Sequence, residues 1–385
     1  MKELTIVSKK VIKSCKPVLE QLYRKSKRIY IEIFFHEKDV EIDKIDKLGI
    51  DVSPLIKTGI LRKVGDRIRA NVQVFPLSGK FICTDFLFSI HRIRNGRFIR
   101  RRDDVWPILP YESPYLAKKA IVEDGDVVLD LATGSGIIAL FTAEKAERVI
   151  ATDINPKAIK YAKFNAILNN LEEKIEFKIG DLFEPVYGMK FDLIIFNGPT
   201  IAAPNVPEKY PLYCFGGPDG LQFTRRFIKE APYHLTKKGK MQWLDPSIGS
   251  INEPESLKII RKEWHDKNFK VIYIKRAGPD DLFKVIKYID KRLWYEPINP
   301  NIKRPLWIKP ITKEEYNNWI SFLRRSGYTH IYAGMYKVYK DRKFKVIKTT
   351  DRAKLFKRMN YLSLNEYHFL SYSRILQLLK ICESY

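Results

Sequence analysis

Three carboxylates and one amide stand at the ends of apolar runs between residues 127 and 200, and these are the side chains best placed to do chemistry. The first run, residues 127–140, has the pattern of a strand ending at Asp130, a glycine-containing turn over residues 133–136, and an apolar helix. Glycine permits positive φ and close approach of a ligand, and a helix start presents unpaired N–H groups. This corner predicts a ligand site at the carboxyl edge of a parallel sheet.

The next three runs place further polar residues at strand ends, namely Asp153, Asp181 and Asn197. Asp153 lies 23 residues beyond Asp130, where a carboxylate can accept both hydroxyls of a ribose, as in proteins that bind NAD or S-adenosylmethionine. Asp181 is well placed to reach an adenine amino group. The alternation of strands and helices predicts an α/β, doubly wound and mostly parallel sheet.

In this order and spacing, the four motifs resemble the class I S-adenosylmethionine-dependent methyltransferases, in the branch with Asn-Pro-Pro-aromatic after the fourth strand. The family's Asp-x-Gly-x-Gly-x-Gly is Asp-Leu-Ala-Thr-Gly-Ser-Gly here, with Ala132 in place of the first glycine. The resemblance implies a Rossmann-like sheet with an antiparallel edge strand and S-adenosylmethionine as cofactor. It also implies that Gly134 and Gly136 line the methionine part, that Asp153 binds the ribose, and that Asp181 with Leu182 binds the adenine. The predicted cofactor set is Asp130, Thr133, Gly134, Ser135, Gly136, Asp153, Ile154, Asp181, Leu182 and Asn197.

The acceptor motif departs from the family, since it is Asn197-Gly198-Pro199-Thr200 in this chain. Methyl transfer to nitrogen needs an acceptor whose hydrogens are held by carbonyl oxygens so that its lone pair points at the methyl carbon. The Asn197 side chain and the Gly198 carbonyl would supply these oxygens, and Asn197, Gly198 and Pro199 are the predicted catalytic residues. Thr200 removes the ring that would stack on a planar acceptor. The aromatic residues that could replace it are Tyr210, Tyr213 and Phe215.

Two flanking segments extend the resemblance. The Gly-Gly-x-Asp-Gly-Leu run at residues 216–221 matches protein-glutamine methyltransferases and their relatives. Glu112 and Ser113 match a short segment that closes over the cofactor in the same relatives, although the same residues also have the pattern of an ordinary helix start.

Composition bounds the class of protein. An apolar content of 45% and a charged content of 30% in 385 residues are globular values, which argues against wholesale disorder. No apolar run approaches the ~20 residues of a membrane helix and the first residues have no long apolar stretch, so we expect a cytoplasmic protein. The four cysteines and six histidines are scattered, which predicts neither a metal site nor a disulfide framework.

The net charge of +25 is unevenly distributed. Residues 1–110 hold 24 Lys and Arg against 13 Asp and Glu, residues 111–250 hold 17 against 18, and residues 251–385 hold 29 against 14. Basic flanks around a neutral core fit an RNA-binding footprint, and a lysine-rich solvated surface is the alternative interpretation. The densest cluster, the candidate RNA contact, consists of Arg92, Arg94, Arg97, Arg100, Arg101 and Arg102.

Three regions are predicted. Residues 1–104 form a small, basic α+β accessory domain, winged-helix-like, with a helix over residues 11–30 and a hairpin about Gly65-Asp66. Residues 105–350 form the methyltransferase domain, with a basic insertion near 280–310, a helix opened by a Thr312–Glu315 capping box, and a hairpin turning at Asp341-Arg342. Residues 351–385 form a helical extension.

The primary functional hypothesis is an S-adenosylmethionine-dependent N-methyltransferase that acts on a base in structured rRNA or tRNA. A protein-glutamine or a small-molecule N-methyltransferase is the alternative. A non-catalytic RNA-binding protein with a vestigial cofactor pocket is the alternative of a different class, motivated by Gly198 and Thr200. A dehydrogenase would leave Asn197 unexplained.

Overall fold

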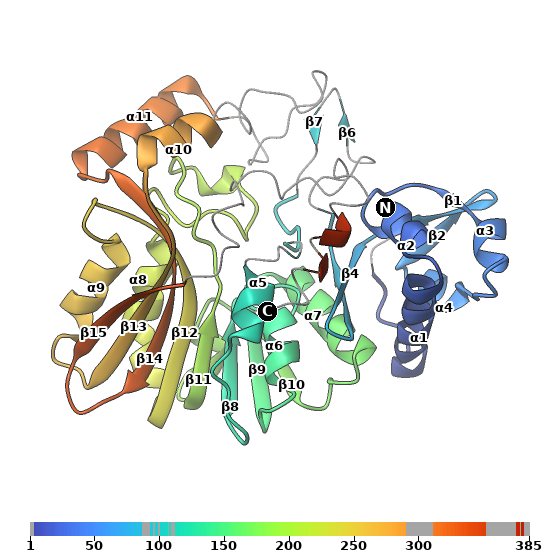
Figure 1. Cartoon of the computed structure of the whole chain (residues 1–385), viewed down its shortest axis with the longest axis horizontal. Helices are drawn as coiled ribbons and strands as arrows, with labels where there is room; N and C mark the ends of the chain where they lie inside the picture. Colours follow the sequence, from blue (N-terminus) through green and yellow to red (C-terminus); the bar gives the residue numbers. More distant parts are fainter. Residues whose placement is uncertain are drawn as a thin grey trace.

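The computed structural model describes residues 4–86, 93–94, 97–98, 101–106, 108, 112–289, 311–351, 375–377 and 379–380. A large twisted sheet with helices on both faces forms the centre of the molecule (Figure 1), and the N-terminal region lies beside one of its helical layers. No helix among these residues is long and apolar enough to cross a membrane.

Eight strands form the central sheet, in the order β10-β9-β8-β11-β12-β14-β13-β15. Strands β8 to β12 run parallel, β14 runs antiparallel to both of its neighbours, and β15 runs parallel to β13. This confirms the predicted doubly wound, mostly parallel fold with an antiparallel strand towards one edge. The strands are β8 (Val127–Leu131), β9 (Arg148–Asp153), β10 (Ile175–Ile179), β11 (Phe191–Phe196), β12 (Leu235–Gly249), β13 (Phe269–Asp281), β14 (His330–Lys340) and β15 (Lys345–Thr350).

The predicted hairpin at Asp341-Arg342 is wrong, because β14 and β15 are not neighbours in the sheet. A strand has two hydrogen-bonding edges, and β14 uses one for β12 and the other for β13. The only edge left to β15 in this part of the sheet is the outer edge of β13, which it joins in parallel. Inserting β14 between two distant strands requires long-range pairing that adjacency in sequence does not reveal.

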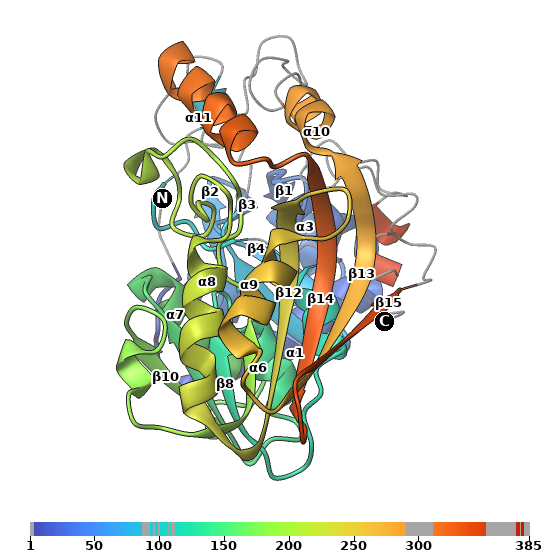
Figure 2. The same ribbon diagram turned by 90° about the vertical axis from the view of Figure 1, so that its left-hand side faces the viewer.

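Alternating side chains of β11 separate the two faces of the sheet. Leu193 and Ile195 pack towards α6 and α7, whereas Ile194 and Phe196 pack towards α8 and α9. Figure 2 shows α8 and α9 together on the face opposite α6. The helices of this part of the chain are α5 (Ser113–Lys118), α6 (Ile137–Thr142), α7 (Pro156–Leu168), α8 (Gln222–Glu230), α9 (Glu255–Trp264), α10 (Leu282–Ile289) and α11 (Lys313–Arg325).

Helix α11 begins as predicted, at a capping box. The Thr312 hydroxyl accepts from the Glu315 N–H at 3.1 Å, and the Glu315 carboxylate accepts from the Thr312 N–H at 2.8 Å. These bonds satisfy two backbone donors that a helix start would otherwise expose. Helices α10 and α11 lie together beyond one end of the sheet (Figures 1 and 2). Residues 290–310, most of the predicted basic insertion, fall outside the described residues.

Residues 4–86 of the N-terminal region contain four helices and two small sheets. The hairpin about Gly65-Asp66 is confirmed, with Val64 opposite Arg67 and a φ of +63° at Gly65. β1 pairs with β3 in the order β1-β3-β2, and β4 pairs with β5 separately. The winged-helix-like description stays a prediction. The elements are α1 (Lys9–Lys25), α2 (Lys27–Phe34), β1 (Val40–Glu41), α3 (Ile42–Asp46), α4 (Ser53–Lys57), β2 (Leu61–Val64), β3 (Arg67–Ala70), β4 (Gln73–Leu77) and β5 (Lys80–Thr84).

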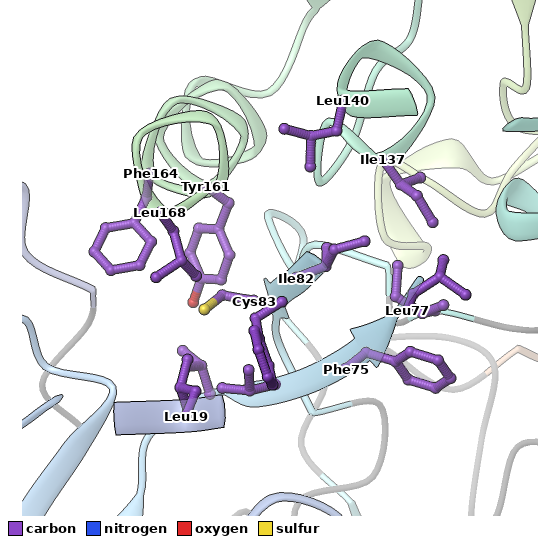
Figure 3. Close-up of a cluster of buried hydrophobic side chains, with 14 of the residues drawn as sticks. Leu19, Phe75, Leu77, Ile82, Cys83, Ile137, Leu140, Tyr161, Phe164 and Leu168 are labelled. Carbon is purple, nitrogen blue, oxygen red and sulfur yellow. The ribbon is translucent and has the colours of Figure 1, made fainter. Parts of the chain in front are cut away.

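One hydrophobic core joins this region to helices α6 and α7 (Figure 3). Side chains from α1, β4 and β5, such as Leu19, Phe75 and Ile82, face the helices that carry Leu140 and Phe164. The N-terminal region is therefore packed onto the domain that holds the cavity.

Two asparagines of α7 act as partners for the β5 backbone. Asn165 bonds both the N–H and the carbonyl of Cys83, at 2.8 and 3.0 Å, and Asn169 does the same for Phe81, at 3.0 and 2.8 Å. A strand edge that would need water is thereby satisfied by buried side chains.

The arginine cluster of residues 92–102 and the C-terminus are described only in part. Arg94 and Arg97 lie in the short pair β6 (Ile93–Arg94) and β7 (Arg97–Phe98), whose side chains are outside the described residues, as are Arg92 and Arg100. Of the predicted C-terminal helix, residues 375–377 and 379–380 are described and helical, and Ile375 and Leu379 are buried.

Candidate functional site

A cavity of about 690 Å³ opens at the carboxyl ends of the parallel strands, where the sequence places its polar residues. One end is lined by the glycine loop, Asp153 and Asp181, and the middle by Asn197. The far wall comes from α10, α11, β13 and β14. The predicted residues that line it are Thr133, Gly134, Ser135, Asp153, Ile154, Asp181, Leu182, Asn197, Gly198 and Pro199.

Asp130 and Gly136 support the glycine loop from behind and are not among the residues that line the cavity. The fully buried Asp130 accepts from the Thr133 hydroxyl at 2.5 Å and from the Ala139 N–H at 3.0 Å, which ties the loop to the start of α6. Burial raises the pKa of Asp130 to about 7. At Gly136, with φ +83°, an added Cβ would lie 3.0 Å from the Ala162 Cβ, so glycine lets α6 approach α7.

Ala132 adopts a backbone conformation that suits the family's glycine, with φ +59°. A side chain in the left-handed region costs about 1 kcal/mol. We therefore expect Ala132→Gly to raise the free energy of unfolding by up to about 1 kcal/mol, measured by chemical denaturation. Ala139→Gly is the matched control, because Ala139 lies in right-handed helix α6 and its loss should destabilise by about 1 kcal/mol. Equal destabilisation by both changes would contradict the strain at Ala132.

Asp153 is anchored where a ribose carboxylate is expected. Its Oδ2 accepts from the Gly134 N–H and its Oδ1 from the Asn155 N–H, both at 2.9 Å. Burial raises the pKa of Asp153, and these backbone bonds act in the opposite direction. Each oxygen keeps lone-pair capacity for a further donor, so this pair of acceptors fits the vicinal hydroxyls of a ribose.

We expect Asp153→Ala to weaken S-adenosylmethionine binding by at least about tenfold, because charge-assisted hydrogen bonds contribute roughly 1.5–3 kcal/mol. Isothermal titration calorimetry measures this affinity. Asp153→Asn is the control, since it keeps one oxygen acceptor and should lose less. An affinity unchanged by Asp153→Ala would remove Asp153 from the cofactor site.

Asp181 and Leu182 both line the cavity, and their role in binding the adenine stays a prediction. The Asp181 Oδ2 accepts from Arg226 Nη1 of α8 at 2.8 Å. The other carboxylate oxygen remains available to accept from an amino group. Ile154 also lines the cavity and is 52% exposed, which gives the cavity an apolar surface next to the ribose carboxylate.

Asn197 is oriented by Ser113, which with Glu112 matches a short segment of the related methyltransferases. The Asn197 Nδ2 donates to the Ser113 Oγ at 2.9 Å. Since the amide nitrogen is committed to α5, the Asn197 Oδ1 is the atom left to accept from a ligand in the cavity. Ser113 begins α5, so the predicted helix start is confirmed, and Glu112 and Ser113 both line the cavity, whereas closure of this segment over the cofactor stays a prediction.

The ring of Phe196 leaves no room for a side chain at Gly198. An added Cβ at residue 198 would lie 2.3 Å from both Cε2 and Cζ of Phe196, whose ring stacks on Phe227 at 4.9 Å. The family's proline does not fit over this ring, and the departure from Asn-Pro-Pro is therefore a packing consequence of Phe196.

The Gly-Gly-x-Asp-Gly-Leu run packs against the acceptor loop, residues 197–200. Added Cβ atoms at Gly216 and Gly220 would lie 2.7 Å from the Thr200 Cα and 2.4 Å from the Thr200 carbonyl oxygen. Asp219 fixes the run by accepting from the Leu221 N–H at 3.0 Å and by pairing with Arg225. Glycine is used here for close approach of two backbones.

Of the three candidate aromatics, Tyr213 lines the cavity, together with Trp106, whose ring centroid is 4.6 Å away. Tyr210 and Phe215 instead stack on each other in a separate buried cluster, so the structure does not place them at the acceptor. Trp106 and Tyr213 thus form an aromatic pair in the wall of the cavity that Asn197 also lines.

The far wall was missed by the sequence analysis. It includes Arg276 and Ala277 of β13, Leu282 and Ile286 of α10, and Trp319 of α11. These residues follow no motif, and they belong to strands and helices whose place in the fold depends on long-range pairing. Within the described part of the chain, no group of His, Cys, Asp and Glu is arranged to hold a metal ion.

Known proteins are similar to this chain over its central part. The methyltransferase small domain model matches residues 113–246. A putative protein N5-glutamine methyltransferase from Methanocaldococcus jannaschii is 40% identical over 37% of this chain and 74% of its own length. A release factor glutamine methyltransferase from Thermodesulfovibrio yellowstonii is 31% identical over 51% of this chain and 73% of its own length. Among solved structures, wild-type Trm5b from Pyrococcus abyssi is 18% identical with a TM-score of 0.40, over 73% of this chain and 62% of its own.

Proposed function

Because the chain belongs to the class I S-adenosylmethionine-dependent methyltransferases, we propose that it methylates the side-chain amide nitrogen of a glutamine in a protein. The observation that carries the proposal is the orientation of Asn197, whose Nδ2 is held by Ser113. A fixed Oδ1 at the middle of the cavity is the acceptor that a planar N–H group needs.

The site's residues divide the work of this reaction. Bound S-adenosylmethionine supplies a methyl group on a positively charged sulfur, which is already electrophilic. Asp153 and Asp181 would hold the ribose and the adenine. The Asn197 Oδ1 and the Gly198 carbonyl would accept the amide hydrogens and turn the nitrogen lone pair towards the methyl carbon. Apolar residues of α10 and α11 would exclude water.

Two further observations support a glutamine acceptor. The two relatives named above carry this activity in their names, and the chain covers 74% and 73% of their lengths. The run at residues 216–221 packs directly against the loop that follows Asn197, so the part that matches protein-glutamine methyltransferases supports the loop that would position the acceptor.

A labelling experiment tests the acceptor class. The purified chain is incubated with methyl-tritiated S-adenosylmethionine and separate protein, RNA and metabolite fractions of the source organism. We expect label in protein, and mass spectrometry should locate it on a glutamine side chain. Label confined to RNA or to metabolites would overturn the glutamine proposal.

A base in structured RNA is the second candidate, because of one observation. The basic excess lies on both flanks and spares residues 111–250, which hold 17 Lys and Arg against 18 Asp and Glu. A planar exocyclic amine would meet the same two acceptors as a glutamine amide. RNA labelling that falls steeply with added salt would favour this candidate.

A further inference from the structure

Glu112 directly precedes Ser113, the residue that orients Asn197, and its carboxylate has no part in the proposed binding of cofactor or acceptor. It immediately precedes α5 and lines the cavity. Trp106 Nε1 donates to the Glu112 Oε2 at 2.8 Å, and this bond fixes the carboxylate beside the ring pair of Trp106 and Tyr213. The next residue, Ser113, accepts from Asn197. One short segment thus presents a carboxylate and holds the acceptor-binding amide.

The positive charge of Arg276, in the far wall, acts on Glu112. Lys275 lies opposite Gly334 and Ala277 opposite Ala333, so Arg276 is the extra residue of a β-bulge in β13. A bulge turns a side chain away from its regular direction, and Arg276 lines the cavity although it is only 8% exposed. Its guanidinium lies 4.0 Å from the ring centroid of Tyr115 in α5.

Burial and charge act in opposite directions on this carboxyl. Burial raises the pKa of Glu112 to about 7, while the Trp106 hydrogen bond and the Arg276 charge lower it. A group that titrates near neutrality is half ionised at working pH, which is the condition for an efficient proton acceptor. The other charged residues that line the cavity are Arg102, Asp104, Asp153, Asp181, Asp219 and Arg226.

Methylation of an N–H group creates a need for such an acceptor. An amide nitrogen is a weak nucleophile because its lone pair is delocalised into the carbonyl, and after methylation it must lose a proton. The acceptor end of the cavity has apolar walls from Leu282, Ile286 and Trp319, which limit access of water as a base.

We propose that Glu112 is a catalytic residue that accepts the proton released by the methylated nitrogen. The new N–CH3 bond forms as the S–CH3 bond breaks and its electron pair returns to sulfur. The N–H proton passes to a Glu112 carboxylate oxygen, and from there to solvent after product release. Arg276 is a positioning residue whose charge favours the ionised form of Glu112. The inference rests on the proposed N-methyltransferase activity, and it applies to whichever nitrogen acceptor is labelled.

Glu112→Gln tests the proposal on the fraction that the native chain labels. We expect kcat to fall by about 100-fold or more, while the affinity for S-adenosylmethionine changes less than about twofold. The native chain should show kcat rising with pH through an apparent pKa near 7, and E112Q should lose this dependence. Glu173→Gln is the matched control, because Glu173 is an exposed acid paired with Lys9, and it should behave as the native chain.

Trp106→Phe supplies a second, independent readout. The change keeps a ring beside Tyr213 but removes the Nε1 donor, whose hydrogen bond lowers the pKa of Glu112. The rising limb of the pH profile should therefore move to higher pH. This measurement tests the proposal even if E112Q does not fold.

Two outcomes overturn the proposal. The first is a native-like kcat for E112Q, and if its affinity for S-adenosylmethionine is also lower, Glu112 is a cofactor-binding residue. The second is a pH profile that W106F leaves unmoved. Failure of the glutamine proposal is separate, since it shows as label in RNA or metabolites from the native chain.

Discussion

Asn197→Ala is expected to reduce methyl transfer by at least about 100-fold while changing the affinity for S-adenosylmethionine by less than about twofold. The variant removes the Oδ1 acceptor from the middle of the cavity and leaves Asp153 and its backbone bonds in place. An acceptor nitrogen without this oxygen is free to rotate its lone pair away from the methyl carbon. Single-turnover transfer and calorimetry measure the two effects separately.

Ser113→Ala is the graded control for this prediction. It removes the oxygen that accepts from the Asn197 Nδ2 but keeps the Asn197 side chain. We expect a smaller loss than for N197A, about tenfold, because the amide can still accept but is no longer held in one rotamer. Full turnover by N197A would exclude Asn197 from the mechanism. A larger loss in S113A than in N197A would assign the main role to Ser113.

The cofactor end of the cavity could be predicted from the sequence because its signals are local. Asp130 and Asp153 lie at the ends of β8 and β9, and Asp181 and Asn197 follow the ends of β10 and β11. Parallel strands bring their carboxyl ends to one edge, so four separate motifs meet in one place. Asp130 was predicted to belong to the cofactor site, whereas in the structure it supports the glycine loop from behind and does not line the cavity.

The acceptor end could not be predicted, because it depends on long-range pairing. Strand β14 enters between β12 and β13, and the bulge that turns Arg276 into the cavity exists only in that pairing. The wall of α10 and α11 follows from the same arrangement and lies beyond residues 113–246, the part matched by the family model. Local periodicity places these residues in strands and helices and carries no information about which cavity they reach.

The departure at residue 198 shows how one packing choice changes a motif. Phe196 is buried between the sheet and α8, and its ring stacks on Phe227 with an interplanar angle of 12°. The same ring extends under the backbone of Gly198. A smaller residue at 196 would leave room for a side chain at 198, so the glycine reflects the size of its neighbour and says nothing against catalysis.

Gly198→Ala is accordingly expected to lower the free energy of unfolding by about 1–3 kcal/mol, the usual cost of overpacking a core. The added Cβ would meet the Phe196 ring at 2.3 Å, so either the ring or the acceptor loop must shift. Because the Gly198 carbonyl is one of the two proposed acceptors, we also expect methyl transfer to fall by at least about tenfold. Chemical denaturation and single-turnover transfer measure these effects.

A double-mutant cycle with Phe196→Leu isolates the cause. Leucine lacks the Cε2 and Cζ atoms that the new Cβ would meet, so G198A should cost clearly less in the F196L background than in the native chain. The two residues are in direct contact, and a coupling energy of about 1 kcal/mol or more is expected. Additive costs would show that Phe196 does not determine the residue at 198.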